Sequence, residues 1–320
     1  MINQCYGNRN IHKEEKLLMG QVTNSEVTSS ATINSISQAW EEKPIPTEIS
    51  HNDIPPPPMN DMIPEICSAS EHAINFNADE YLQAFYSIPT NDVAMHTILF
   101  FLPGILYWIP EKIRTLLDLG AGPTVYVPII FRKHAKHIYS ADCAENSCDM
   151  LKNWAKNKSS FEWTEVCKWI ACIENSNESP AMMEQTARGR FKAVLRADLH
   201  TEPIIKRVHY KCSDSDDIPQ QFHVVVSIFC LEYSSENLEG YRHAVRSAVN
   251  LIEPNGFLIQ GGVLQASDYY FGNRRYRCHY LTREQVIESL KENNMVVEKD
   301  GNFKWFEFDD VFLLVTRKKA

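Results

Sequence analysis

Three acidic residues of this sequence stand at or next to the end of an apolar run. They are Asp118, Asp142 and Asp198. In an open α/β sheet the carboxyl ends of the strands meet at one edge, and ligands bind there. An acid that ends the second strand can accept hydrogen bonds from both ribose hydroxyls of a nucleotide-like cofactor. The three acids therefore predict such a cofactor, with Asp142 at its ribose.

The loop after the first of these runs carries two glycines, in the stretch Asp118-Leu-Gly-Ala-Gly. Glycine lets a ligand approach the backbone closely, so we expect Gly120, Ala121 and Gly122 to contact the cofactor. Dinucleotide-binding loops carry a third glycine three residues later, where this sequence has Val125. The loop therefore favours a different cofactor, and an NAD-dependent oxidoreductase is kept as an alternative.

Alternating strands and helices are needed to bring these residues together. Apolar runs typical of buried strands alternate with segments whose apolar residues have helical spacing. The predicted strands are residues 112–119, 137–142, 191–198, 222–229, 256–264, 295–299 and 310–318. This order predicts an α/β fold in which a parallel sheet is covered by helices on both faces, a three-layer α/β/α arrangement.

The predicted strands belong to one domain with two additions. Residues 1–68 are rich in Ser, Thr, Asn and Glu. That composition cannot bury enough apolar surface to offset the entropy of ordering, so we expect a disordered tail. Residues 69–320 form the predicted domain. Its helical cap spans about residues 72–110, with Asn77 as an N-cap, and an insertion spans about residues 158–190.

The overall composition excludes several classes of function. The net charge is −9, whereas nucleic-acid binding needs a basic face. No apolar run approaches the ~18 residues of a membrane span, and the N-terminus lacks the apolar core of a signal peptide. Nine cysteines occur without a C-x-x-C pair, which favours free thiols over disulfides or a metal site. We therefore expect a cytoplasmic protein that binds neither nucleic acid, membrane nor metal.

Several stretches, taken in order along the chain, are similar to one family. They are NFNADEYLQAFY, DLGAGPTVY, LRADL, VVVSIFCLE and LIEPNGFLI, and the similarity covers about residues 75–318. The pattern resembles the nicotinamide, phenylethanolamine and indolethylamine N-methyltransferases, which are class I S-adenosylmethionine-dependent methyltransferases. The resemblance implies a Rossmann-like, seven-stranded methyltransferase sheet with its terminal strand antiparallel, and an N-terminal helical lid.

The family resemblance also implies a reaction. The cofactor would be S-adenosyl-L-methionine, and its methyl group would pass to a small amine or N-heterocycle of the phenylethanolamine, indolethylamine or pyridine type. The enzyme would be a monomer. A relative that binds S-adenosylmethionine without catalysis is kept as a second alternative.

The resemblance assigns most of the cofactor site. Tyr81 and Tyr86 would close over the methionine end from the lid, and Asp198 would hold the adenine. The expected cofactor-binding residues are Tyr81, Tyr86, Gly120, Ala121, Gly122, Tyr126, Asp142, Ser147, Asp198, Leu199 and Ile228.

An acceptor site is expected beside the cofactor. An ammonium acceptor must lose its proton before its nitrogen can attack, and a carboxylate can bind the cation and take that proton. Glu232, just after the fourth strand, matches the carboxylate of amine-using family members and is the candidate catalytic residue. By the same resemblance, Tyr269 and Asp310 would bind the acceptor.

The sequence departs from the family at four positions. Ser147 stands where the family commonly has Asn, which affects one cofactor contact. Gly262 stands where nicotinamide-specific members have the Asp that binds the carboxamide, and Ala266 and Cys278 replace acceptor-site serines. We therefore expect nicotinamide not to be the favoured substrate.

Overall fold

The computed structural model describes residues 65–320, except residues 90, 110–111, 215–216, 273 and 299–301. Most of the predicted tail therefore lies outside the described residues. Its last part does not, because Glu65–Cys67 form strand β1. The described structure thus includes the last few residues of the segment that was assigned to the tail. No helix in the described ranges has the length and apolar character to cross a bilayer.

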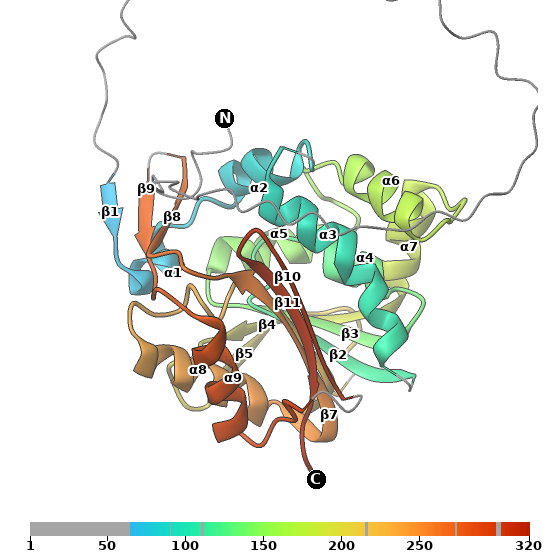
Figure 1. Ribbon diagram of the computed structural model, residues 1–320. Coiled ribbons are helices and arrows are strands. Elements are labelled where there is room, and N and C mark those ends of the chain that lie inside the picture. Colours follow the sequence, from blue (N-terminus) through green and yellow to red (C-terminus); the bar gives the residue numbers. More distant parts are fainter. Residues whose placement is uncertain (1–64, 90, 110–111, 215–216, 273, 299–301) are drawn as a thin grey trace, which may run out of the picture. The chain divides into compact units, whose positions relative to one another are not determined.

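An eight-stranded mixed sheet forms the centre of the fold (Figure 1). In spatial order its strands are β10 (Phe303–Phe308), β11 (Val311–Arg317), β7 (Ile252–Val263), β6 (Phe222–Ile228), β2 (Ile113–Leu119), β3 (Ala135–Asp142), β4 (Phe191–Ala197) and β5 (Ile205–Lys211). The strands from β7 to β4 run parallel to one another, and β11 lies antiparallel between β7 and β10. The Rossmann-like methyltransferase sheet with its antiparallel terminal strand is confirmed.

Two strands differ from the sequence prediction. The predicted strand at residues 295–299 is wrong: Met295 makes one isolated bridge with Lys318 and is fully buried, so its apolar side chain fills the core without extending a ladder. The sixth methyltransferase strand is instead β10. The eighth strand, β5, was not predicted because its polar, charged sequence lacks the apolar pattern of a buried strand, and it pairs antiparallel at the sheet edge.

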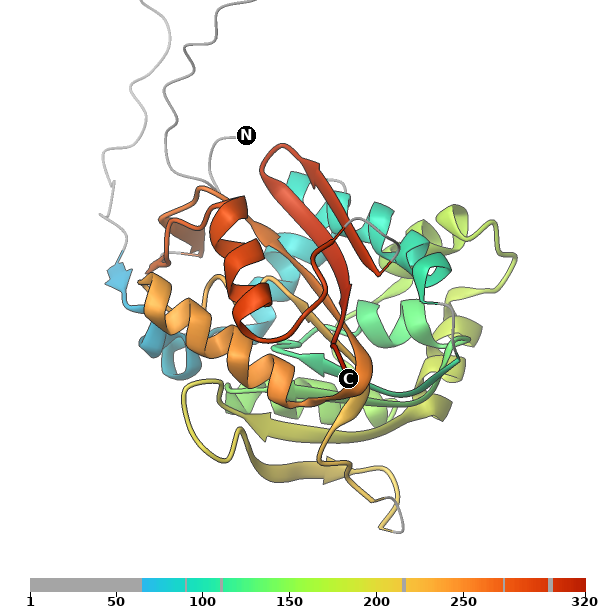
Figure 2. The same ribbon diagram turned by 60° about the horizontal axis from the view of Figure 1, so that its bottom comes forward.

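Helices cover both faces of the sheet (Figures 1 and 2). One face packs against α3 (Val93–Ile105), α4 (Tyr126–Phe131), α5 (Glu145–Ala155), α6 (Thr164–Ile173) and α7 (Pro180–Arg190). The opposite face packs against α8 (Leu238–Asn250) and α9 (Arg283–Glu292). A short 3-10 helix, η2 (Leu106–Trp108), follows α3, and α6 and α7 lie within the predicted insertion.

The N-terminal elements dock on a small second sheet. These elements are β1, η1 (Ala69–Glu71), α1 (His72–Asn75) and α2 (Ala78–Tyr86). Strand β1 pairs in parallel with β9 (Arg274–Arg277), which forms an antiparallel hairpin with β8 (Asp268–Phe271). The Arg274 guanidinium donates to the Asn75 carbonyl at 2.5 Å, and the Asn146 amide donates to the Phe76 carbonyl. The N-terminal segment that contains β1 and α1 thus packs against the β8–β9 hairpin from the C-terminal part of the domain.

Candidate active site

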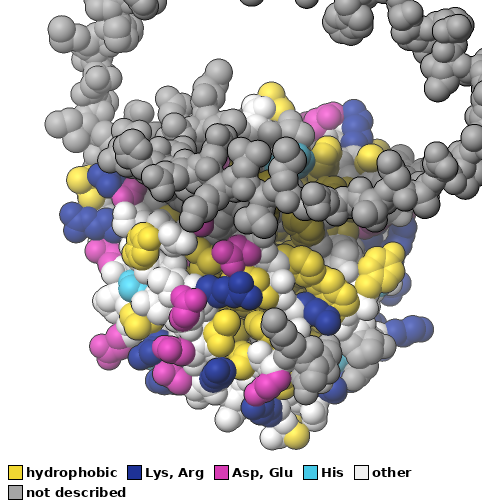
Figure 3. All heavy atoms as spheres, viewed as in Figure 1, with side chains coloured by type: hydrophobic (Ala, Val, Ile, Leu, Met, Phe, Trp, Pro, Cys, Tyr) yellow, Lys and Arg dark blue, Asp and Glu magenta, His cyan; other side chains and the backbone are white. Residues whose placement is uncertain are grey.

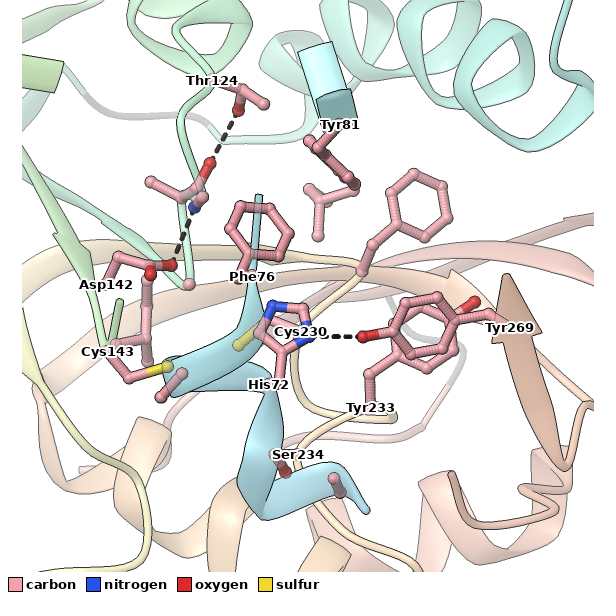
Figure 4. A pocket seen from close by; sticks show the side chains of 18 of the residues that line it. His72, Phe76, Tyr81, Thr124, Asp142, Cys143, Cys230, Tyr233, Ser234 and Tyr269 are labelled. Atoms are coloured by element: carbon pink, nitrogen blue, oxygen red, sulfur yellow. Dashed lines mark hydrogen bonds between the residues drawn. The ribbon is translucent and has the colours of Figure 1, made fainter. Parts of the chain in front are cut away.

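A cavity of about 400 Å³ lies at the carboxyl ends of β2, β3, β4 and β6 (Figure 4). Its floor is formed by the loops that follow these strands, and its roof by η1, α1, α2 and β8. All the expected cofactor-binding residues except Ser147 line it, and so does Tyr269. The strand ends and the predicted lid therefore meet around one space.

The glycine loop forms the first part of the floor. Gly120 and Gly122 have positive φ angles of 74° and 56°, a conformation that favours glycine. The amides of Gly120 and Ala121 both donate to the Ala141 carbonyl, at 2.8 and 3.0 Å, which fixes the loop against β3. A Cβ atom at Gly120 would overlap Cys230, whereas the space beside Gly122 is open. The loop thus leaves room for a ligand at Gly122.

Asp142 lies in the cavity wall at the end of β3. Its carboxylate accepts hydrogen bonds from the backbone amides of Gly122 at 2.9 Å and Ala144 at 2.8 Å. Burial raises the pKa of Asp142, and these two amides counteract that rise. Each oxygen keeps a further lone pair, so the side chain can accept two ribose hydroxyls.

Ser147 lies behind Asp142 and not in the cavity wall. It is fully buried on α5, and its hydroxyl lowers the pKa of Asp142. Ser147 is thus the one expected cofactor-binding residue that the structure places outside the cavity lining. Asp118 is also buried beneath the loop, where burial and the nearby Asp142 hold its pKa well above the usual range.

The opposite side of the floor can hold a flat base. Leu199 and Ile228 are buried apolar residues that line the cavity, and Asp198 lies beside them. One Asp198 oxygen accepts from the His200 amide at 2.9 Å, which orients the carboxylate. An apolar slot with one acidic edge suits an adenine ring and its amino group.

The predicted lid tyrosines are packed over the floor. Tyr86 stacks on Tyr126, with ring centroids 5.7 Å apart, and its hydroxyl donates to the Met95 sulfur at 3.0 Å. Tyr81 lies one turn earlier on α2, 6.0 Å from the Tyr86 ring. All three tyrosines line the cavity, and burial raises their pKa values, so they keep their protons.

An aromatic wall closes the other end of the cavity (Figure 4). It consists of His72, Phe76, Tyr81, Tyr233 and Tyr269. The ring centroids of Tyr233 and Tyr269 are 4.3 Å apart, and those of His72 and Phe76 are 4.6 Å apart. Nδ1 of His72 lies 2.5 Å from the Tyr269 hydroxyl oxygen, and burial lowers the pKa of His72 to about 4. His72, Phe76 and Tyr233 were not predicted, because no sequence spacing connects them.

Glu232 lies behind this cavity. Its side chain is buried, and it fills the space over Gly262, where an added Cβ would overlap its carboxylate. Neither carboxylate oxygen has a hydrogen-bonding partner of ordinary geometry among the described residues. Burial raises the pKa of Glu232 to about 8, although nearby backbone amides act to lower it. The carboxyl group is therefore largely uncharged at neutral pH.

Asp310, expected to bind the acceptor, does not reach the cavity. It lies at the turn between β10 and β11, where its carbonyl accepts from the Leu264 amide at 2.8 Å. This turn places Asp310 beside the end of β7 and outside the cavity lining, which gives no support to the expected role.

The sheet order, the glycine loop and the acids at the strand ends together define an S-adenosylmethionine-dependent methyltransferase. Residues 65–319 match the NNMT/PNMT/TEMT family, so the chain belongs to this family. The cofactor is therefore S-adenosylmethionine, which supplies a methyl group on a positively charged sulfur. The open space at Gly122, the carboxylate of Asp142 and the apolar slot at Leu199 fit this group.

Curated relatives include nicotinamide and phenylethanolamine N-methyltransferases. The chain is 48% identical over 254 residues to a nicotinamide N-methyltransferase of Caenorhabditis elegans, covering 79% of this chain and 93% of the relative. It is 26% identical to the nicotinamide N-methyltransferase of Homo sapiens, covering 75% and 87%. It is 31% identical to the phenylethanolamine N-methyltransferase of Macaca mulatta, covering 55% and 61%.

A solved structure with a similar fold is the N-methyltransferase NodS from Bradyrhizobium japonicum in complex with S-adenosyl-L-homocysteine. It is 14% identical, with a TM-score of 0.42, and the match covers 78% of this chain and 96% of NodS.

Proposed function

We propose that this enzyme methylates the ring nitrogen of an uncharged aromatic N-heterocycle of the pyridine type. The observation that carries this proposal is the aromatic wall, which contains no charged side chain. The carboxylates that line the cavity are Asp92, Asp142 and Asp198, and each already accepts a backbone amide. The relative from Caenorhabditis elegans, a nicotinamide N-methyltransferase by name, supports the same acceptor class.

The chemistry of such an acceptor suits this wall. A pyridine nitrogen has a free lone pair at neutral pH, so no base is required before it attacks the methyl group. The ring becomes positively charged as the new bond forms, and the faces of the surrounding aromatic rings attract that charge. Because the attraction is stronger for the cation than for the neutral ring, it favours the transition state over bound substrate. The lid contributes by aligning the two reactants and excluding water.

Glu232 bears on the argument that Gly262 disfavours nicotinamide. That argument rested on the absence of the family's Asp from this position of β7, whereas the carboxyl group of Glu232 occupies the space above Gly262. An acid is thus present at this place, although it comes from the loop after β6. We propose that Glu232 supports the acceptor end of the site in its uncharged form, so that nicotinamide is a candidate acceptor.

An aromatic ethylamine is the second candidate acceptor. Glu232 favours it, because a buried carboxyl group with a pKa of about 8 could accept an ammonium proton at slightly alkaline pH. In this case Glu232 would act as the general base expected from the sequence.

An acceptor screen separates the two candidates. Methyl-labelled S-adenosylmethionine would be incubated with nicotinamide, 3-methylpyridine, phenylethylamine and tryptamine, and the products identified by mass spectrometry. We expect label on the ring nitrogen of the pyridines, and no more than trace product from the amines. Label on the amines alone would overturn the proposal in favour of the second candidate. Asp142→Asn, which weakens the ribose site, is the control for enzymatic transfer.

We further propose that the enzyme acts in the cytoplasm as a monomer. The eight cysteines that the structure describes are all free thiols, which suits a reducing compartment.

A further inference from the structure

We propose that His72 binds the acceptor directly, by donating a hydrogen bond from Nε2 to a carbonyl-type oxygen on the heterocycle. This inference rests on the proposed function and narrows the acceptor to a pyridine-type ring with such a substituent. His72 comes from α1, a four-residue helix outside the methyltransferase sheet.

The imidazole is held in a fixed position in the cavity wall. Nδ1 lies 2.5 Å from the Tyr269 hydroxyl oxygen, and the ring lies 4.6 Å from Phe76 and 5.3 Å from Tyr276, measured between centroids. Tyr276 is itself fully buried, and its hydroxyl donates to the Asn75 carbonyl at 3.3 Å. A ring held on three sides can offer one atom to a ligand in a defined direction.

The hydrogen bond to Tyr269 decides which nitrogen faces the ligand as a donor. Burial holds the pKa of Tyr269 well above its usual range and lowers that of His72 to about 4, so both groups stay neutral. We assign the Tyr269 hydroxyl as the donor to Nδ1, which puts the single ring proton of His72 on Nε2. Nε2 lies on the side of the ring away from Tyr269 (Figure 4), and no described residue pairs with it.

The positions that carry polar acceptor-site side chains in the family offer no such donor from the cavity wall, and the uncharged carboxyl group of Glu232 lies behind that wall. Gly262 and Ala266 have no polar side chain, and the Cys278 thiol is buried and donates to the Ala266 carbonyl. Aromatic faces can hold a flat ring but leave it free to rotate in its own plane. One directional hydrogen bond would fix that rotation and point the ring nitrogen at the methyl group. His72 supplies a donor of this kind from the aromatic wall.

Three variants and two acceptors test the inference. The acceptors are nicotinamide and 3-methylpyridine, which share the ring but differ in the carbonyl group. His72→Gln can place an amide nitrogen near the position of Nε2, His72→Asn places it near Nδ1, and His72→Phe removes it. We expect His72→Phe and His72→Asn to lower kcat/KM for nicotinamide about 10- to 100-fold, and His72→Gln about threefold. For 3-methylpyridine, which lacks the carbonyl group, His72→Phe and His72→Asn should lower kcat/KM at least about fivefold less than they do for nicotinamide, because His72 then acts only as part of the aromatic wall.

The tautomer is tested independently of activity. Nitrogen-15 NMR of the complex with S-adenosylhomocysteine should show the His72 proton on Nε2, and Tyr269→Phe should remove this preference. A proton on Nδ1 in the wild type would overturn the inference, because His72 could not then donate from Nε2.

Failure of this inference can be told apart from failure of the proposed function. If the wild-type enzyme methylates neither pyridine, the proposed function fails. If the wild-type enzyme methylates both pyridines and His72→Phe lowers kcat/KM equally for both, only the proposed hydrogen bond from His72 fails. An equal loss would reflect a structural effect of the substitution and not the loss of a contact with the carbonyl group. Calorimetry with S-adenosylhomocysteine on each variant verifies that the cofactor site is intact.

Discussion

Individual residues of the cavity floor were predictable because each ends a strand. Asp142 and Asp198 follow apolar runs, and that position alone places them at the ligand-binding edge of a parallel sheet. The aromatic wall was not predictable in the same way. His72, Phe76 and Tyr233 come from three unrelated segments, and only tertiary packing brings them together. Glu232 was predicted as the catalytic residue from the family resemblance, but its burial over Gly262 could not be predicted, because it depends on a contact between the loop after β6 and the end of β7.

Asp142→Asn should weaken binding of S-adenosylhomocysteine roughly 100-fold. The amide keeps one acceptor oxygen for two backbone donors and two ribose hydroxyls, and hydrogen bonds to a charged group contribute about 1.5–3 kcal/mol each. Isothermal titration calorimetry measures the change. Asp310→Asn is the matched control, because Asp310 lies outside the cavity. This variant should bind S-adenosylhomocysteine with the affinity of the wild type. Equal affinity for Asp142→Asn would remove this residue from the cofactor site.

Glu232→Gln should increase stability at alkaline pH. The pKa of Glu232 is about 8 in the folded protein, whereas an ordinary glutamate has a pKa of 4.5, so the native state holds this proton more tightly than the unfolded chain. Its contribution to stability is complete below about pH 4.5 and declines as pH rises towards 8, by roughly 1.4 kcal/mol per pH unit at most. Urea unfolding measures the free energy of unfolding of both proteins at pH 5 and pH 8. The difference between Glu232→Gln and the wild type should shift in favour of the variant at pH 8. An identical difference at both values would mean that Glu232 is ionised in the fold.

At the scale of elements, the five parallel strands were predicted because buried parallel strands are almost continuously apolar. Strand β5 was missed because it is polar and lies at the sheet edge, and the β8–β9 hairpin was missed because its strands have only four residues each and β9 carries three arginines. Strand β1 was assigned to the tail because its three residues carry no signal of their own. It is ordered by pairing with β9, more than 200 residues away in sequence. Such long-range pairing cannot be read from local composition.

Gly262→Ala should destabilise the fold by about 1–3 kcal/mol, because the new methyl group overlaps the Glu232 carboxyl group held between β6 and β7. Gly189→Ala is the matched control: its Cβ meets nothing within 4 Å, and alanine favours the α7 helix. Denaturant unfolding should show a lower free energy of unfolding for Gly262→Ala and a higher one for Gly189→Ala than for the wild type. A neutral Gly262→Ala would mean that Glu232 moves aside without cost.

Arg274→Ala should loosen the roof of the cavity while leaving the central sheet intact. The substitution removes the hydrogen bond from β9 to the Asn75 carbonyl, which joins the hairpin to α1. We expect affinity for S-adenosylhomocysteine to fall about fivefold to tenfold, with little change in melting temperature. Arg277→Ala, an exposed change on the same strand, should have no effect on affinity. If the two variants bind equally well, the docking of α1 on β9 does not support the cofactor site.

At the scale of the whole molecule, the α/β class was predicted from the alternation of apolar runs and helices. The net charge of −9 predicts no affinity for nucleic acid, and this stays a prediction. Acidic and basic side chains are interspersed on the face shown in Figure 3. The order of strands follows from alternation of apolar runs and helices together with right-handed crossovers. The acceptor could not be predicted this way, because it depends on side chains from both ends of the domain meeting over one edge of the sheet.

The cofactor should stabilise the whole domain. S-adenosylhomocysteine at 100 times its dissociation constant adds about 2.7 kcal/mol to the free energy of unfolding, which for a domain of this size raises the melting temperature by roughly 5–10 °C. Differential scanning fluorimetry measures the shift. NADH at the same concentration should give none. A shift with NADH alone would revive the oxidoreductase alternative.

The most direct measurement is a crystal structure with S-adenosylhomocysteine and nicotinamide bound together. We expect the ribose on Asp142, the adenine beside Leu199, and the pyridine ring against Tyr269 with its nitrogen directed at the cofactor sulfur. An acceptor ring bound elsewhere, or an aromatic wall collapsed into the acceptor space, would contradict methyl transfer to a heterocycle at this site.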